Sequence, residues 1–189
     1  ARWGAVVEEP KEQSLLSAEE FAAQYGENAS YGRYVHQNTQ RRLLLWNMES
    51  GDYTVVADHN KDGYIMTADP AQVYGMEHIY QCGDQLRLLN LESGESRTLL
   101  SMEDIINYWV MDSKAFIITD TEAGSRVWVA DLQDGQPVEL VGAADEHGMV
   151  MSPSQEGGSF FRALGDNGQC VISKEDFYAV RFENAVTVG

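Results

Sequence analysis

One short stretch of this sequence has the residue types and spacing of a calcium-binding loop. In DHNKDGYIMTAD, residues 58–69, Asp58, Asn60 and Asp62 stand at alternate positions and a glycine follows them. Calcium takes six or more oxygen ligands, and side chains at positions 1, 3 and 5 of a tight loop can converge on one ion. The glycine at position 6 permits the sharp turn that such a loop needs.

Two more residues would complete this set of ligands. The carbonyl of Tyr64 stands at position 7, and the carboxylate of Asp69 stands at position 12, where EF-hands use a glutamate. A plain link between two strands explains the same composition, because turns are rich in Asp, Asn and Gly. We favour the link. Calcium is the one cofactor for which the sequence offers a candidate site.

No other stretch has the pattern of a catalytic or nucleotide-binding site. The four histidines are not spaced as a zinc pair, and the sequence lacks GxSxG, GxGxxG and GxxxxGK[ST]. His78 lies in MEHIYQ, where we predict an ordinary strand residue. We therefore predict no catalytic residue.

The charge of the chain excludes one class of partner. Thirty acidic residues against 13 basic ones give a formal net charge of −17, and Arg41-Arg42 is the one pair of adjacent basic residues. Such a field repels nucleic acid. The chain also has no apolar run near the roughly 18 residues of a membrane span, so we expect no membrane insertion by this segment.

The two cysteines are far apart in the chain. Cys82 and Cys170 each lie in a strand-like context and form no CxxC motif. We predict two buried free thiols. The alternative is a long-range disulfide, which would imply an oxidising compartment.

The sequence contains an internal repeat that steps through most of the chain. Residues 41–57, 85–101 and 125–141 each have an apolar strand, an Asn or Asp, a short polar stretch, a glycine and a second strand. The dipeptides before the second strand are Ser50-Gly51, Ser93-Gly94 and Asp134-Gly135. They are typical of hairpin turns, because glycine can adopt the positive φ that these turns need.

One full period of the repeat contains four strands. In the best-defined period they cover about residues 106–111, 115–119, 126–132 and 137–141, with a hairpin at Ser113. Four antiparallel strands every 40 to 45 residues are typical of a β-propeller blade. We predict an all-β, propeller-like array of about four four-stranded antiparallel blades with a short N-terminal helix.

Within this repeat, NLESGESRTLL and DLQDGQPVELV resemble the outer hairpin of bacterial tandem-repeat propellers with TolB-like or quinoprotein-like blades. The resemblance covers about residues 40–143. It implies a propeller fold and a secreted or surface setting. It assigns no functional residue, because propellers host unrelated activities.

The ends of the chain fit the repeat less clearly. We predict a single domain over residues 1–189, with an N-terminal segment 1–32 and blades over 33–189. Ser17 and Glu20 form a capping-box pattern that predicts a helix over 18–25. The first blade needs a front strand, from RWGAVVEE or from NAVTVG. A degenerate fourth blade covers 149–182, with FYAVRF as its last strand.

These features favour a non-enzymatic binding or sensing domain that recognises a protein, peptide or glycan. We expect it outside a bacterial cell or on its surface, where a segment absent from this chain could anchor it. One alternative is a hydrolase or lyase with its active site in the central funnel of the propeller. Another is a structural or assembly module that pairs through open sheet edges.

Overall fold

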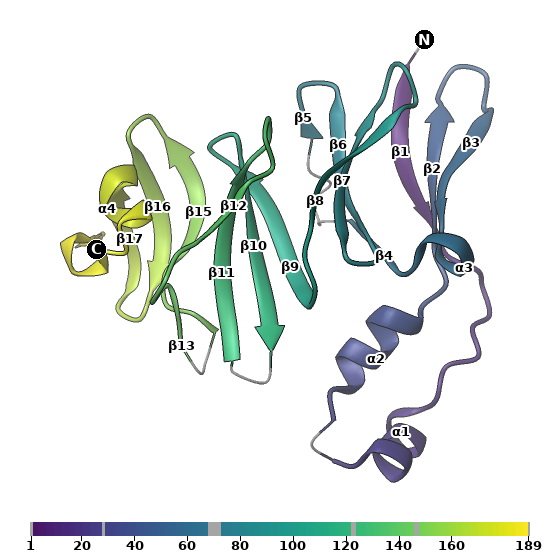
Figure 1. Ribbon diagram of the computed structural model, residues 1–189, viewed down its shortest axis with the longest axis horizontal. Coiled ribbons are helices and arrows are strands. Elements are labelled where there is room, and N and C mark those ends of the chain that lie inside the picture. Colours follow the sequence, from purple (N-terminus) through teal and green to yellow (C-terminus); the bar gives the residue numbers. More distant parts are fainter. Residues whose placement is uncertain (1, 28, 68–72, 122–123, 146–147, 189) are drawn as a thin grey trace. The chain divides into compact units, whose positions relative to one another are not determined.

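The computed structural model describes residues 2–27, 29–67, 73–121, 124–145 and 148–188 (Figure 1). The chain forms two compact units, Ala1–Thr98 and Leu99–Gly189. Strands dominate both units, the strand pairs are antiparallel, and the helices are short. The chain is therefore all-β, as predicted.

The first unit begins with a three-stranded sheet of order β1-β2-β3, here called the N-terminal sheet. Its strands are β1 (Trp3–Glu8), β2 (Arg42–Asn47) and β3 (Tyr53–Asp58). A short helix, α3 (His59–Asp62), follows β3. The next sheet has the order β4-β6-β7-β8, with β5 also paired to β6. Its strands are β4 (Ile65–Thr67), β5 (Val73–Tyr74), β6 (Glu77–Cys82), β7 (Gln85–Asn90) and β8 (Ser96–Ser101), and the unit boundary falls within β8.

The second unit contains two four-stranded sheets. The first has the order β12-β11-β10-β9, with strands β9 (Ile105–Met111), β10 (Lys114–Thr121), β11 (Gly124–Asp131) and β12 (Pro137–Glu139). The second, here called the C-terminal sheet, has the order β15-β16-β17-β18. Its strands are β15 (Ser152–Gly157), β16 (Phe160–Gly165), β17 (Gly168–Ser173) and β18 (Val186–Thr187). The remaining elements are β13 (Ala144–Asp145), β14 (Gly148–Met149), α4 (Lys174–Tyr178) and the 3-10 helix η1 (Phe182–Asn184).

The hairpin between β2 and β3 shows why the repeat has its composition. The side-chain oxygen of Asn47 accepts hydrogen bonds from the backbone N–H groups of Glu49 at 2.9 Å and Ser50 at 3.3 Å. The N–H of Gly51 donates to the Asn47 carbonyl at 2.9 Å. The polar residue at the start of the turn thus satisfies backbone donors that would otherwise lack partners.

The other two hairpins repeat this turn. Asn90 and Asp131 replace Asn47, and their carbonyls accept from the N–H groups of Gly94 and Gly135 at 2.9 Å. The three glycines have φ values of 82°, 74° and 66°, in the left-handed region. The prediction of hairpins turning at these glycines is confirmed.

The hairpin between β9 and β10 uses a different turn. Met111 pairs with Lys114, and the two residues between them, Asp112 and Ser113, both have positive φ, 56° and 55°. Two residues of positive φ match the twist of the flanking strands, but they are unusual without glycine. The predicted hairpin at Ser113 is confirmed, and its backbone is held in an uncommon conformation.

Each unit has an apolar core between its sheets. In the first unit, the inner face of the N-terminal sheet packs on β4, β6 and β7. The buried residues are Leu43, Leu45, Ala57, Ile65, Tyr80, Cys82 and Leu89. In the second unit, Phe116, Val127 and Val129 from β10 and β11 pack on the inner face of the C-terminal sheet. The rings of Phe116, Phe161 and Phe177 meet edge to face there.

Two helices lie in the connection between β1 and β2 of the N-terminal sheet. The helix α1 (Ala18–Tyr25) has the predicted capping box, because Ser17 and Glu20 exchange hydrogen bonds between side chain and backbone. The helix α2 (Tyr31–Asn38), capped by Ser30, was not predicted. Tyr34 of α2 packs on Phe21 of α1 at 4.9 Å between ring centres. The two helices lie beyond the ends of β1 and β2 (Figure 1), and their rings form a small aromatic core.

The structure shows which strand each end of the chain forms. The front strand of the first sheet is β1, from RWGAVVEE, while the C-terminal NAVTVG supplies β18 beside β17. The predicted strand FYAVRF is wrong, because Phe177 and Tyr178 end α4, Phe182 begins η1, and the residues between them form a turn. Ser173 explains the difference: its hydroxyl oxygen accepts from the N–H of Asp176 at 3.0 Å and starts the helix.

Candidate functional site

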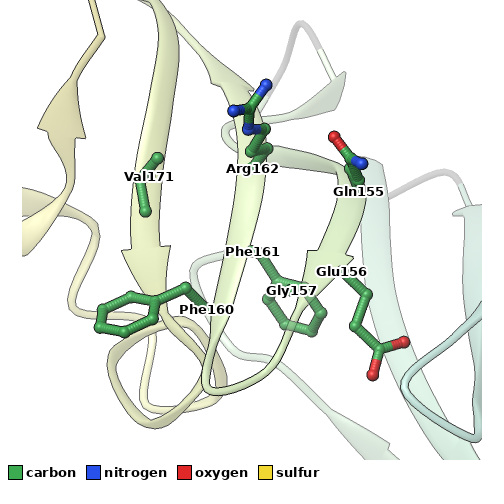
Figure 2. Close-up of a pocket in the computed structure, with 7 residues that line it drawn as sticks. All are labelled: Gln155, Glu156, Gly157, Phe160, Phe161, Arg162 and Val171. Atoms are coloured by element: carbon green, nitrogen blue, oxygen red, sulfur yellow. The ribbon is translucent and has the colours of Figure 1, made fainter.

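The C-terminal sheet carries a surface pocket on its β15–β16 side (Figure 2). The cavity has a volume of about 310 Å³. Its lining residues come from three adjacent strands and are Gln155, Glu156, Gly157, Phe160, Phe161, Arg162 and Val171. The mixture of apolar side chains with an amide, a carboxylate and a guanidinium is typical of a recognition site.

The pleat of β16 places its side chains on two faces. Phe161 and Ala163 are buried in the core, whereas Phe160 is 52% exposed and Leu164 is 59% exposed. Arg162 lies between the two exposed residues and pairs across the sheet with Val171. Successive residues of a strand point to opposite faces, so these residues share the outer face.

Neighbouring strands extend this apolar surface. Val171 of β17 pairs with Val186 of β18, which is 67% exposed, and Val188 beyond it is 50% exposed. We call this surface the outer C-terminal face. It comprises Phe160, Arg162, Leu164, Val171, Val186 and Val188.

Arg162 has no charged partner on this face. Among the described residues, no side chain forms a hydrogen bond or ion pair with its guanidinium, and its carbonyl accepts from the Ser154 hydroxyl at 3.3 Å. A guanidinium offers five donors in a planar fork and also stacks on aromatic rings. Arg162 is therefore available to a carboxylate or an aromatic ring of a partner.

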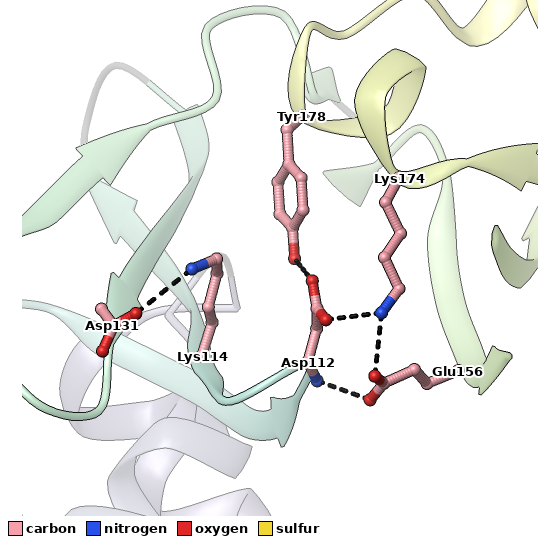
Figure 3. Close-up of polar contacts among 6 residues, drawn as sticks. All are labelled: Asp112, Lys114, Asp131, Glu156, Lys174 and Tyr178. Carbon is pink, nitrogen blue, oxygen red and sulfur yellow. Dashed lines mark hydrogen bonds and ion pairs between the residues drawn. The ribbon is translucent and has the colours of Figure 1, made fainter. Parts of the chain in front are cut away.

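Glu156, on the wall of the pocket, is fixed in place by a polar network (Figure 3). One oxygen of its carboxylate accepts from Lys174 Nζ at 2.8 Å, and the other accepts from the backbone N–H of Asp112 at 2.8 Å. Lys174 Nζ also donates to the Asp112 carboxylate, and the Tyr178 hydroxyl donates to it at 2.7 Å. These bonds tie the β9–β10 turn, with its positive φ values, to α4 and β15.

The pKa shifts show what this network can do. Burial alone would raise the pKa of Asp112, but the hydrogen bonds from Lys174 and Tyr178 outweigh it and lower that pKa. Burial opposes the charge of Lys174, but its two carboxylate partners raise its pKa. Burial and the bond to Asp112 raise the pKa of Tyr178. At neutral pH the network therefore holds the ammonium of Lys174 against the ionised carboxylate of Asp112, and an amine of raised pKa is a poor nucleophile.

The predicted calcium residues lie in the first unit, where the structure describes four of the five. The Asp58 carboxylate accepts from the Asn60 N–H at 2.9 Å, and the Asp62 carboxylate accepts from the Asp58 N–H at 2.8 Å. The Asp58 carboxylate thus bonds to the backbone of α3, and the Asp62 carboxylate bonds from α3 to the backbone at the end of β3. The Tyr64 carbonyl accepts from the Gly83 N–H at 2.8 Å.

Asp69 lies outside the described residues. Within the described part of the chain, no three His, Cys, Asp or Glu side chains are grouped as a metal site. The calcium loop stays a prediction.

Asp58 and Asn60 line a second cavity, of about 500 Å³, beside the basic pair Arg41-Arg42. The guanidinium of Arg41 pairs with Glu9 at 2.6 Å, and that of Arg42 pairs with Glu8. These arginines, unlike Arg162, have acidic partners within the chain.

Two other sequence predictions are confirmed. His78 lies in β6 with 2% of its surface exposed, and burial lowers its pKa. Cys82 and Cys170 are free and buried, in different units. Burial raises the pKa of both thiols, which lowers their reactivity.

Sequence reasoning did not find Arg162, Glu156 or the network around Asp112. One signal was present: FFRALG alternates so that Phe160, Arg162 and Leu164 share a face. The pattern does not say which face is open, because Phe161 and Ala163 are apolar too.

Across the described residues, no helix has the length and apolar character needed to cross a membrane.

Comparison with known proteins finds a likeness among solved structures. No family model and no curated protein matches the sequence. Among solved structures, the crystal structure of TolB from Acinetobacter baumannii is similar with a TM-score of 0.47 and 11% sequence identity. The similarity covers 74% of this chain and 36% of the TolB chain, so the chain spans well under half of that protein. A closed propeller stays a prediction.

Proposed function

We propose that the chain is a non-enzymatic protein-binding domain made of propeller-like β-sheets, and that the outer C-terminal face contacts the partner. The observation that supports this most is Arg162, which has no side-chain partner among the described residues and lies between exposed Phe160 and Leu164. An apolar patch around a polar anchor is the usual composition of a protein contact surface.

The free energy gained by burying the exposed apolar side chains of this face is large enough for specific binding. Full burial of a Phe or Leu side chain stabilises by about 1.5–3 kcal/mol, so covering two half-exposed residues contributes on the order of 2–3 kcal/mol. Phe and Arg are also enriched at protein interfaces. Arg162 would add orientation, because a carboxylate can accept two parallel hydrogen bonds from its fork.

Protein is a better match than glycan for this face. Sugars stack on broad aromatic surfaces, but Leu164, Val186 and Val188 are aliphatic and lie beside a single exposed ring. Aliphatic side chains pack well against the side chains of a peptide or protein. An exported or cell-surface location belongs to the same proposal and is supported by the resemblance of the repeats to secreted propellers. Fractionation of the source bacterium would test it.

Selection of random displayed peptides on the purified chain tests the binding proposal. We expect enriched peptides to combine apolar residues with a carboxylate. Arg162→Glu and Phe160→Asp should each weaken their binding at least about tenfold, by removing one anchor of the contact. Val141→Asp is the matched control, because Val141 is 76% exposed but lies outside this face. Equal binding to the wild type and to both face variants would contradict the proposal.

A further inference from the structure

The N-terminal sheet also leaves one face open. Trp46 pairs with Tyr53 across the sheet, and these residues are 39% and 57% exposed. Val6, Met48 and Val55 are 39%, 47% and 42% exposed. We call this surface the outer N-terminal face. It comprises Val6, Trp46, Met48, Tyr53 and Val55.

The register explains why these side chains lie together. Trp46 pairs with Gly4 on β1, and a side chain at Gly4 would collide with Met48. Gly4 therefore leaves room for Met48 to lie over β1. Leu43 and Leu45 point the other way, into the core. The N-terminal sheet thus turns one face to the core, and on its other face the exposed side chains lie around Leu44, which is 8% exposed.

Strands in the middle of the chain are different. Consecutive residues of β6 from His78 to Cys82 are all buried, and Ala115, Phe116 and Ile117 of β10 are fully buried. The N-terminal and C-terminal sheets both have apolar outer faces. An exposed apolar face of this kind associates with other molecules.

We infer that the outer N-terminal face of one copy binds the outer C-terminal face of a second copy. This inference rests on the proposed function, because it assigns a partner to the same face. It describes a head-to-tail contact, in which each copy keeps one face free for the next molecule.

Charge and ring chemistry favour this pairing over contact between two identical faces. Two outer C-terminal faces would bring two unpaired Arg162 groups into one interface, and like charges there are unfavourable. The outer N-terminal face instead offers Trp46 and Tyr53, whose rings attract a guanidinium stacked on them. The carboxylate of Glu8, 42% exposed, lies on the same side of the sheet and already pairs with Arg42 there, so the rings rather than this carboxylate favour the contact.

The size of the contact predicts weak association. Three strands of six residues span about 14 by 20 Å, at about 4.8 Å between strands and 3.3 Å per residue. The flat area of this face is therefore roughly 300 Å², without the extra surface of protruding side chains. A standard interface buries about 800 Å² on each partner. Association should therefore appear at high protein concentration.

Sedimentation of the 189-residue chain over a concentration series, combined with mixing of two variants, tests the inference. Phe160→Asp blocks the outer C-terminal face, and Trp46→Asp blocks the outer N-terminal face. The wild type should grow beyond dimer as concentration rises. Each variant alone should remain monomeric, because every contact needs one face of each kind.

The mixture of the two variants is the decisive measurement. Phe160→Asp retains its N-terminal face and Trp46→Asp retains its C-terminal face, so one good contact can form. The mixture should reach twice the monomer mass and stop there. Val141→Asp should associate like the wild type. Far-UV circular dichroism checks folding, and Leu164→Asp and Tyr53→Asp replace any variant that does not fold.

Three results would overturn the inference: a wild type that stays monomeric, a variant that associates like the wild type, or a mixture that stays monomeric. Loss of association in Phe160→Asp but not in Trp46→Asp would indicate contact between two C-terminal faces. In that case the proposed binding face would stand and its assigned partner would be wrong. Peptide binding that ignores Phe160 and Arg162 would instead reject the proposed function itself.

Discussion

The turns at Gly51 and Gly135 have the same hydrogen bonds but different surroundings. In both, an Asn or Asp begins the turn and a glycine of positive φ ends it. A side chain at Gly51 would meet nothing within 4 Å, whereas one at Gly135 would lie 2.0 Å from the carbonyl oxygen of Leu99. The same local pattern therefore has one role in the first turn and two in the third: it makes the turn, and it lets two backbone segments approach.

The largest effect should come from Gly135→Ala. Left-handed strain adds about 1 kcal/mol, and forcing an atom against a packed backbone adds about 1–3 kcal/mol. We expect the free energy of unfolding to fall by about 3 kcal/mol in urea titrations followed by circular dichroism. A loss under about 1 kcal/mol would show that the two segments can separate freely.

Gly94→Ala should have an intermediate effect. A Cβ there would lie 3.2 Å from Cδ2 of Leu45, a side-chain atom that can shift by a few tenths of an ångström. We expect a loss of about 1.5 kcal/mol in the same urea titration, most of it from the positive φ of 74°. A loss of stability equal to that of Gly135→Ala would contradict this account, because it would mean that a movable side-chain neighbour costs as much as a backbone neighbour.

Gly51→Ala isolates the conformational strain. Its surroundings are open, so the loss should be about 1 kcal/mol and should arise from φ alone. Gly51→Asn is the control, because asparagine tolerates the left-handed region better than alanine. Both variants should be measured by the same titration, and an Asn variant that is less stable than the Ala variant would contradict this account.

The turns also differ in one titratable group, since Asp131 stands where the others have asparagine. The hydrogen bond from the N–H of Gln133 lowers the pKa of Asp131. The ion pair with Lys114, drawn in Figure 3, lowers it further. A lowered folded-state pKa stabilises the fold above the ordinary aspartate pKa of about 4, and this contribution is lost as pH falls through the folded-state value. Asp131→Asn should therefore lose less thermal stability than the wild type between about pH 5 and pH 2.

The reverse exchange tests the same point in the first turn. Asn47→Asp should acquire a loss of stability at acidic pH that the wild-type turn lacks. Melting temperatures measured across the acidic range check both variants. Identical pH profiles for Asp131→Asn and wild type would show that this carboxylate does not contribute.

The calcium-like pattern of residues 58–64 occurs once in the chain, unlike the repeated turns. We expect calcium to have no effect on stability there. The Asp58 and Asp62 carboxylates already accept backbone N–H groups of Asn60 and Asp58, so millimolar calcium should leave the melting temperature of chelator-treated protein unchanged. Calcium at a hundredfold excess over its dissociation constant would instead stabilise by about 2.7 kcal/mol. A rise that Asp62→Ala abolishes would establish the metal site.

Much of the fold follows from the sequence because it is local. The period of the repeat, the hairpins and the helix α1 were all predicted from residues within one turn or one strand pair. The sequence did not show that β1 rather than NAVTVG would pair with β2, since the partners are separated by two helices. The helix α4 was also not predicted, although Ser173 stands three residues before Asp176, which is the spacing of an N-terminal helix cap.

The candidate site was not predictable in the same way. Asp112, Glu156 and Lys174 are far apart in the chain and meet only when β9, β15 and α4 pack. Neither Phe160 nor Phe161 shows by its type which of them will be exposed. The choice depends on which face of β16 the core covers.

The sequence by itself determined the all-β class, the period of the repeat and the chemistry of the turns, because these depend on backbone hydrogen bonds between near neighbours. Only the tertiary structure decided that Gly135 lies against Leu99, that Arg162 has no charged partner among the described residues, and that the terminal sheets keep apolar outer faces. The physical reason is that close approach and burial depend on which distant segments pack together, and alternation along a strand leaves that choice open.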